Sequence, residues 1–68
     1  MKISLKAARV NANLTQEDAA KALHKSKQTL VNWECGRCAI KFKDVLMLAE
    51  LYDIPVECLD IPVPDKNS

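Results

Sequence analysis

The chain has 68 residues, of which 49% are hydrophobic and 28% charged, the composition of a single soluble globular domain with no room for a second. Its net charge of +1 conceals an uneven distribution, because residues 1–43 carry nine Lys or Arg against three Asp or Glu. Residues 44–68 carry one Lys against six acidic residues, so only the basic part is suited to a polyanionic partner.

The amino terminus and the cysteines indicate a cytoplasmic protein. No apolar run of signal-peptide length follows Lys2, and the longest apolar run, residues 45–49, is far shorter than the roughly 20 residues that span a bilayer. The three cysteines are an odd number in a chain without a secretory signal, which argues against a disulfide framework. We therefore expect no membrane partner and a fold that is stabilised by packing.

Four-residue periodicity without strict alternation predicts an all-α, compact fold of five helices. The first helix is expected from Ser4 to Ala12, and Arg9 lies on the same face as the apolar Leu5 and Ala8. The charge of Arg9 on this apolar face requires an explanation.

The second and third helices are predicted by their N-caps and by the short link between them. Thr15, with Asp18 three residues later, forms a capping box that opens a helix ending near Leu23. Ser26 caps the third helix, which covers residues 27–34. Since only two residues separate the second helix from this cap, the two helices must meet at a steep angle.

The third helix is expected to have two unlike faces. Leu30 and Trp33 point inward. A helical wheel places a polar but weakly charged set on the opposite side, namely Gln28, Val31, Asn32 and Cys35. This outward face is therefore free for a partner.

The rest of the chain is predicted to form two further helices and a tail. After a loop at Gly36, the fourth helix has an apolar side made of Phe42, Val45, Leu46, Leu48, Ala49 and Tyr52. Pro55 opens a short fifth helix that ends at Leu59, which closes a domain of residues 1–59. Residues 60–68 contain two prolines and are expected to form an extended or frayed tail.

Three polar residues fall where the predicted helices end. Asn13, His24 and Asp53 occupy positions that glycine usually takes, because the chain turns there through positive φ. Asn, Asp and His tolerate that conformation better than other residues with side chains. A single glycine therefore suffices for the fold.

A helix, a two-residue turn and a second helix with a polar outward face form a helix-turn-helix arrangement. Its residues are Arg9-x4-Leu14-Thr15-Gln16-x2-Ala19-Ala20-x2-Leu23, then Ser26-x3-Leu30-x2-Trp33-Glu34-x-Gly36, then Leu48-Ala49. This pattern resembles the lambda-repressor-like (Cro/XRE-type) helix-turn-helix family over about residues 3–59. The resemblance implies a bacterial or phage-type transcriptional regulator, a repressor, that binds double-stranded DNA sequence-specifically. The alternative is the same fold used as a protein-interaction module, an antitoxin or anti-repressor.

The resemblance implies DNA contacts at the matched positions. Lys27, Gln28 and Asn32 would enter the major groove, and Gln16 would bind a phosphate at the start of the second helix. The residue types suit this role, since Lys can meet guanine O6 and N7, and Gln or Asn can pair with adenine N6 and N7. Val31 on the same face is placed to touch a thymine methyl group.

Further roles follow from the same resemblance. Arg9 would pair with Glu34, which ends the third helix, and a phosphate contact by Arg9 is equally open. Backbone N–H groups near Gly36 and Arg37, followed by Lys41 and Lys43, would meet the DNA backbone. The acidic residues 44–68 would face away from DNA.

Cys35 and Cys38 form a CxxC motif with two chemical interpretations. One is half of a zinc site completed by Cys58 and His24, and the other is a redox switch beside the DNA-facing loop. A single pair of cysteines, without a second pair or a thioredoxin-like βαβ pattern, argues against both. The family usually has Asn at position 35, so Cys35 is also readable as a simple replacement.

The sequence contains neither a Ser, His and acid set, nor a carboxylate pair, nor a phosphate-binding glycine loop. We therefore expect no enzyme, no cofactor, no metal and no small-molecule ligand. Family members commonly bind near-palindromic operators as dimers, which implies a homodimer on DNA. The expected interface is the fourth-to-fifth helix region with Ile54, Ile61 and Val63.

Overall fold

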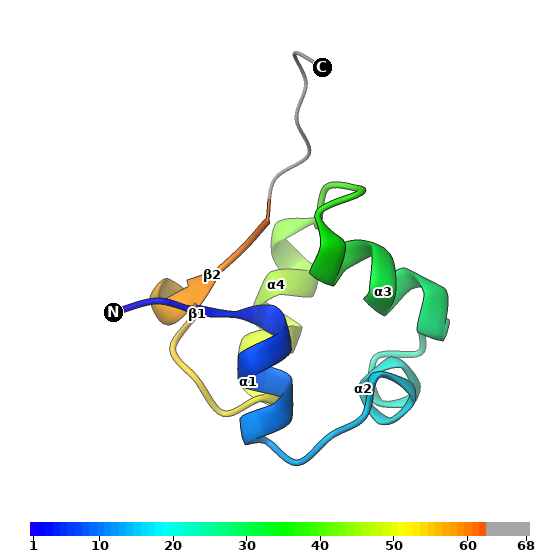
Figure 1. The fold of residues 1–68 in the computed structure, drawn as a ribbon, viewed down its shortest axis with the longest axis horizontal. Coiled ribbons are helices and arrows are strands. Elements are labelled where there is room, and N and C mark those ends of the chain that lie inside the picture. The colour runs from blue at the N-terminus through cyan, green and yellow to red at the C-terminus, as the bar shows by residue number, and fades with distance from the viewer. Residues whose placement is uncertain (63–68) are drawn as a thin grey trace.

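Four α-helices and one short pair of strands make up residues 1–62, which are the residues that the computed structural model describes. In chain order the elements are β1 (Ile3–Ser4), α1 (Leu5–Asn11), α2 (Gln16–Ala22), α3 (Lys27–Cys35), α4 (Phe42–Leu51), the 3-10 turn η1 (Val56–Cys58) and β2 (Leu59–Asp60) (Figure 1). In this part of the chain no helix is both long and apolar enough to cross a membrane.

Side-chain caps start the first three helices. The Ser4 hydroxyl accepts a hydrogen bond from the Ala7 amide at 3.0 Å, and Ser26 does the same for Thr29 at 3.2 Å. At α2 both halves of the predicted capping box are present, because Asp18 N–H donates to Thr15 Oγ1 and Thr15 N–H donates to the Asp18 carboxylate. The caps confirm the predicted starts of the second and third helices, and they move the start of the first helix to Leu5.

Left-handed backbone occurs where the sequence predicts it. The φ angles are 61° at Asn13, 57° at His24 and 54° at Asp53. Gly36 follows α3 with φ 73°, and a Cβ atom built there would lie 3.0 Å from Cβ of Pro62. Gly36 is thus required both by its conformation and by the close approach of Pro62.

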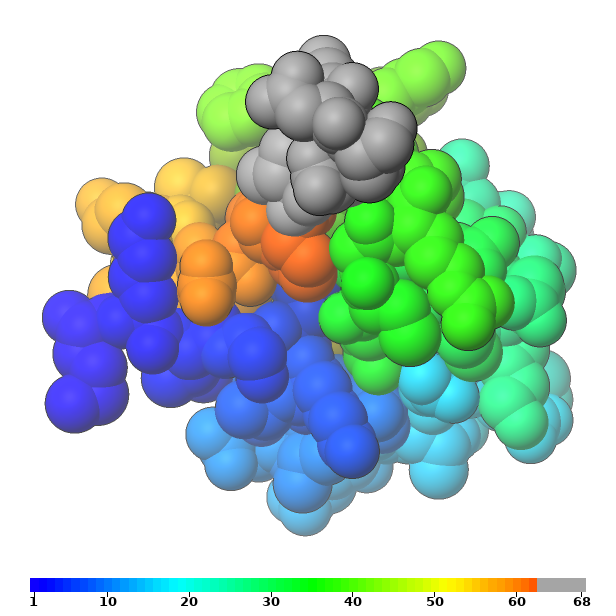
Figure 2. Space-filling model, turned by 45° about the horizontal axis from the view of Figure 1, so that its top comes forward, coloured from blue at the N-terminus to red at the C-terminus, as the bar shows by residue number. Residues whose placement is uncertain are grey.

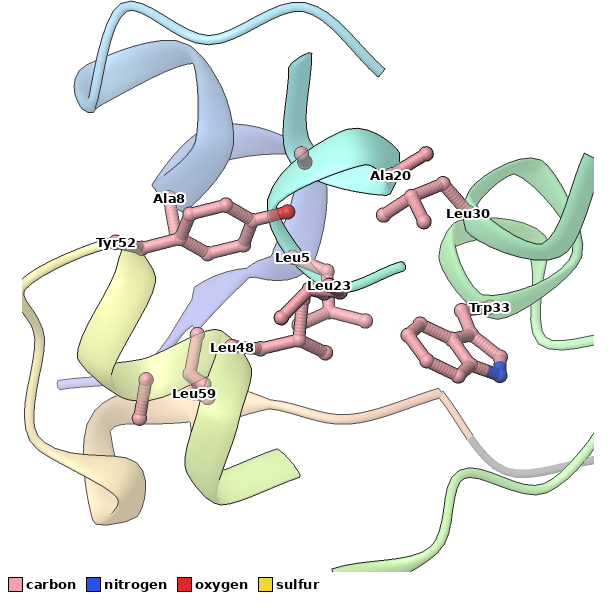
Figure 3. Close-up of a cluster of buried hydrophobic side chains, with 11 residues drawn as sticks. Leu5, Ala8, Ala20, Leu23, Leu30, Trp33, Leu48, Tyr52 and Leu59 are labelled. Carbon is pink, nitrogen blue, oxygen red and sulfur yellow. The ribbon is translucent and has the colours of Figure 1, made fainter. Parts of the chain in front are cut away.

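A single hydrophobic core lies between the helices (Figure 3). Leu5, Leu30 and Leu48, from three different helices, are its most deeply buried large side chains. Each is expected to contribute about 1.5–3 kcal/mol by leaving water. Around them pack the other core side chains, Ala8, Ala19, Ala20, Leu23, Trp33, Ala49, Tyr52 and Leu59.

The expected fifth helix is not confirmed as an α-helix, because Val56–Cys58 form one 3-10 turn, closed by a 2.9 Å bond from Cys58 N–H to the Pro55 carbonyl. A segment this short cannot offset the cost of nucleating an α-helix. Leu59 instead becomes extended and enters β2, which pairs in parallel with β1 in the register Ile3 to Leu59. Figure 2 shows this segment between the N-terminal residues and the loop after α3.

The α4 helix buries a narrower stripe than predicted. Val45, Leu48, Ala49 and Tyr52 are buried, as expected. Phe42 is 70% exposed and Leu46 45% exposed, so these two members of the predicted apolar side do not pack into the core. Helical side chains lean toward the helix N-terminus, and the side chain of Phe42, the first residue of α4, therefore projects beyond the core.

Candidate nucleic-acid interface

The α2 and α3 helices are joined by a tight turn. After Leu23 ends α2, His24 takes its left-handed conformation, and Lys25 N–H bonds back to the Ala20 carbonyl at 2.8 Å. Ser26 then caps α3. In Figure 1, α2 is seen almost along its axis while α3 runs across the view, so the two helices cross steeply. This is the geometry of a helix-turn-helix unit.

The α3 helix presents one face to the core and another to solvent. Leu30 and Trp33 are buried and anchor it. On the other side Lys27 and Gln28 are exposed, and Val31 and Asn32 are half-buried. Gln28 Nε2 donates to Asn32 Oδ1 at 3.0 Å, one helical turn away. Each amide keeps free hydrogen-bonding groups, so the pair presents both donors and acceptors to a partner.

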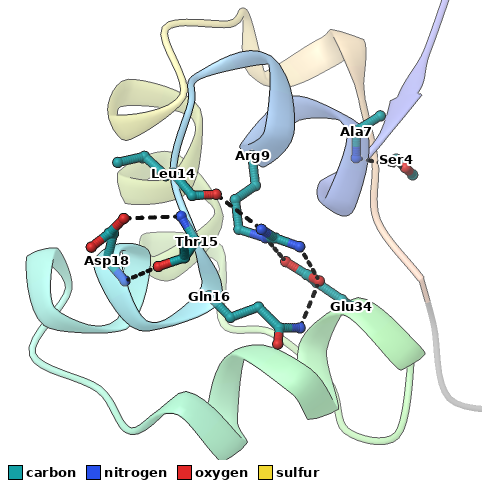
Figure 4. Close-up of polar contacts among 8 residues, drawn as sticks. All are labelled: Ser4, Ala7, Arg9, Leu14, Thr15, Gln16, Asp18 and Glu34. Carbon is teal, nitrogen blue, oxygen red and sulfur yellow. Dashed lines mark hydrogen bonds and ion pairs between the residues drawn. The ribbon is translucent and has the colours of Figure 1, made fainter.

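A buried polar network fixes α3 against α1 and the start of α2 (Figure 4). Arg9 Nε lies 2.8 Å from Glu34 Oε2, and these side chains are only 10% and 6% exposed. Arg9 Nη1 also donates to the Leu14 carbonyl at 2.9 Å. The charge on the apolar face of α1 therefore has a buried partner, and its burial leaves the guanidinium little surface for a phosphate.

Glu34 also holds Gln16, a contact that the sequence did not predict. Gln16 Nε2 donates to Glu34 Oε1 at 3.0 Å. An ionised carboxylate only accepts hydrogen bonds, so it requires the amide nitrogen of Gln16 to face inward. The second N–H of this nitrogen remains for a partner. No spacing rule links residues 18 positions apart, and the contact depends on the tertiary fold.

The loop after α3 carries the remaining predicted backbone contacts. Gly36 N–H donates to the Trp33 carbonyl at 3.2 Å, and Arg37 N–H donates to the Asn32 carbonyl at 2.9 Å. These bonds cap α3 and occupy the two amides, and contact of this loop with the DNA backbone stays a prediction. The side chains of Arg37, Lys41 and Lys43 are exposed and lie in the loop or the first turn of α4.

Comparison with known proteins agrees with this geometry. A family model described as helix-turn-helix, of the Cro/C1 type, matches residues 5–57. The chain belongs to the Cro/C1-type helix-turn-helix family. It is also similar to an uncharacterised HTH-type transcriptional regulator of Methanocaldococcus jannaschii, with 36% identity over 66 residues that cover 97% of this chain and 100% of the relative. No solved structure matches the chain.

In this Cro/C1-type chain α2 and α3 are the first and second helices of the helix-turn-helix unit. The family is a regulatory DNA-binding family and not an enzyme family. Lys27, which begins α3, lies 4.0 Å from Glu17, and both side chains are more than half exposed. Such an exposed pair contributes little to stability, so Lys27 can exchange Glu17 for another anionic group at small cost.

The three cysteines of the helix-turn-helix chain are free, Cys35 and Cys38 exposed and Cys58 half-buried. Within residues 1–62 no group of three or more His, Cys, Asp or Glu side chains is placed to hold a metal ion. The structure therefore does not bring His24 and Cys58 together with the CxxC motif as the zinc interpretation requires.

Two titratable groups of the helix-turn-helix domain have shifted pKa values. The hydrogen bonds from the backbone and the hydroxyl of Thr15 lower the pKa of Asp18 below 3.8. Burial raises the pKa of Tyr52 to about 12, and the charge of Glu34 adds to the shift while that of Arg9 opposes it. The Tyr52 hydroxyl is buried and has no hydrogen-bond partner among the described residues.

Proposed function

We propose that this protein is a sequence-specific transcriptional regulator, a repressor, that binds double-stranded DNA with α3 in the major groove. The observation that carries the proposal is the two-faced α3, anchored by Leu30 and Trp33 while its polar side is open to solvent. An α-helix with its side chains is about 10–12 Å across, which matches a major groove about 12 Å wide.

Four side chains of α3 are proposed to read bases. Lys27 is suited to guanine O6 and N7, and the Gln28 and Asn32 amides are suited to adenine N6 and N7. Val31 is suited to a thymine methyl group. Each well-placed pair discriminates by about 1–3 kcal/mol. The hydrogen bond between Gln28 and Asn32 orders both side chains before DNA arrives, which lowers the entropy lost on binding.

The DNA backbone is proposed to contact side chains on either side of α3. Gln16, held by Glu34, would donate its second amide N–H to a phosphate. Arg37, Lys41 and Lys43 would supply positive charge. Affinity should then fall steeply with salt, with a slope of about −0.9 per neutralised phosphate on logarithmic axes.

The operator is proposed to be near-palindromic and bound by a homodimer, with half-sites about one helical turn apart. Ile54 and Ile61, expected in the interface, pack half-buried against the core. Val63 lies outside the described residues. The exposed apolar side chains of α4, Phe42, Leu46 and Met47, are therefore the better-supported surface for a second copy.

The second candidate is a protein-interaction module of the same fold. The same α4 side chains favour it, because Phe42, Leu46 and Met47 are open to any apolar partner. The acidic residues of α4 and of the segment that follows it would then select a basic protein. The two candidates differ in whether the outer face of α3 is used.

Selection from random DNA duplexes tests the proposal. The wild-type chain should enrich one motif, whereas Lys27→Ala and Gln28→Ala should each relax it at the positions they read. Lys6→Ala, which removes an exposed positive charge from α1, is the matched control and should retain the motif. If neither α3 substitution changes the selected motif, the assignment of α3 to the groove is wrong. If no duplex is enriched, the interaction module becomes the better explanation.

A further inference from the structure

The two thiols of Cys35 and Cys38 have no part in the proposed DNA contacts. Both are free and exposed, whereas Cys58 is half-buried in η1. They flank Gly36 and Arg37 at the end of the recognition helix. Exposed thiols are open to small thiol-reactive molecules in a way that buried ones are not.

The backbone bends repeatedly between Cys35 and Cys38. Cys35 is the last residue of α3, Gly36 turns the chain through φ 73°, and the chain bends again at Arg37 and Cys38. A disulfide requires a Cα separation of about 4.4–6.8 Å. Successive bends allow two cysteines three positions apart to approach that separation, so a rearrangement of this loop can join the two sulfur atoms.

Gly36 packs closely against Pro62 on one side. The position of its missing Cβ lies 3.0 Å from Cβ of Pro62, and the segment from β2 to Pro62 covers this side of the loop (Figure 2). Arg37 and Cys38 have greater freedom, because both are exposed. Closing a ring through Cys35 and Cys38 would therefore move Arg37 and strain the bonds from the Gly36 and Arg37 amides to Trp33 and Asn32.

We propose that Cys35 and Cys38 are a reversible modification site that a low-molecular-weight disulfide oxidises. One cysteine thiolate attacks a sulfur of the small disulfide, which forms a mixed disulfide and releases the first small thiol. The other cysteine then attacks the mixed disulfide, forms the bond between Cys35 and Cys38 and releases the second small thiol. The protein loses two electrons and two protons, and the small disulfide gains both.

The consequence for DNA rests on the proposed function. In the proposed function, Arg37 contacts a phosphate and Asn32 reads a base. The Arg37 amide donates a hydrogen bond to the Asn32 carbonyl. Ring closure therefore disturbs both kinds of contact. The affinity for the selected duplex should fall about tenfold or more on oxidation and return fully with reductant.

To test the site, the whole chain is equilibrated with mixtures of oxidised and reduced glutathione. The free thiols are then alkylated, and the mass of the product is measured by mass spectrometry. The reduced chain, with three cysteines, takes three alkyl groups, and the oxidised chain should take one, on Cys58. Cys58→Ser is the matched control and should still oxidise. Cys35→Ser and Cys38→Ser should form only mixed disulfides or remain reduced. Mixed or intermolecular disulfides in the wild-type chain would overturn the site.

Two further measurements separate this proposal from the proposed function. Amide hydrogen exchange at Gly36 and Arg37 should accelerate on oxidation, whether or not the chain binds DNA. Failure of the reduced chain to bind any duplex would refute the proposed function, while alkylation and exchange would still decide the modification site. Equal affinity of the oxidised and reduced chains for the selected duplex would overturn the regulatory consequence.

Discussion

Residues 1–43 combine side-chain hydrogen bonds with apolar burial, whereas residues 44–62 pack through apolar side chains. Among the described residues, every side-chain hydrogen bond and ion pair found lies between Ser4 and Glu34. The later part, around α4, contributes apolar side chains to the core and a Tyr52 hydroxyl without a partner. We conclude that side-chain hydrogen bonds and ion pairs orient the proposed DNA-facing side chains, while burial of apolar side chains stabilises the core that supports them.

The largest effect is expected where the polar network is buried. Glu34→Ala leaves the Arg9 guanidinium buried without its partner, which typically costs about 3–5 kcal/mol of unfolding free energy. A domain of this size has only a few kcal/mol to lose, so thermal unfolding followed by circular dichroism should show a largely unfolded chain at 25 °C. Glu17→Ala, in the exposed pair with Lys27, should cost less than about 1 kcal/mol. Similar losses for both variants would break the comparison.

The next largest loss of stability is expected in the apolar core around α4. Leu48 is completely buried, and Leu48→Ala should lower the free energy of unfolding by about 2–5 kcal/mol without removing any side-chain hydrogen bond. Leu46→Ala on the exposed side of α4 is the control and should change it by less than about 1 kcal/mol. Urea unfolding measures both. Equal losses would mean that α4 buries a different face.

Features that depend on neighbouring residues were predicted from the sequence better than contacts between distant residues. The caps at Thr15 and Ser26 and the left-handed turns depend on residues close in the chain, and all were predicted. The pairing of Ile3 with Leu59 and the contact of Gln16 with Glu34 join distant residues and follow no spacing rule.

Other features that the sequence did not predict have the same origin. The exposure of Phe42 depends on where the core ends, and the hydrogen bonds of the Gly36 and Arg37 amides depend on the form of the α3 cap. The hydrophobic periodicity of the sequence reveals neither the boundary of the core nor the form of the α3 cap. The fold and the outward face of α3 could therefore be predicted, whereas the network that orients Gln16 could not.

A smaller effect of opposite sign is expected at Tyr52. Its buried hydroxyl lacks a partner, so Tyr52→Phe should raise the unfolding free energy by about 1 kcal/mol. The pKa of Tyr52 is raised from 10.0 to about 12, so the unfolded chain ionises first. The contribution of the neutral Tyr52 phenol to the free energy of unfolding is thus complete below pH 10 and is lost as pH rises to about 12.

This prediction is controlled by comparing the stability of the wild type and Tyr52→Phe at alkaline pH. Between pH 10 and 12 the wild type should lose stability faster than Tyr52→Phe, because only the wild type has this phenol to ionise. Urea unfolding at several pH values measures the difference. A variant less stable than the wild type at neutral pH would show that the hydroxyl has a partner and that the later part of the chain also uses polar contacts.

An effect of similar size, again a loss of stability, is expected at the exposed α2 cap. Thr15→Ala removes the hydroxyl that accepts from the Asp18 amide and should cost about 0.5–2 kcal/mol, whereas Thr15→Ser keeps the hydroxyl and should cost less. The Thr15 backbone and hydroxyl lower the pKa of Asp18, so the folded chain releases this proton first. The contribution of Asp18 is therefore present above pH 3.8 and is lost as pH falls through the lowered pKa. Asp18→Asn should match the wild type in acid and be less stable at neutral pH. A difference independent of pH would mean that the capping box acts through shape alone, and the basic part of the chain would then depend less on directional contacts than its hydrogen bonds indicate.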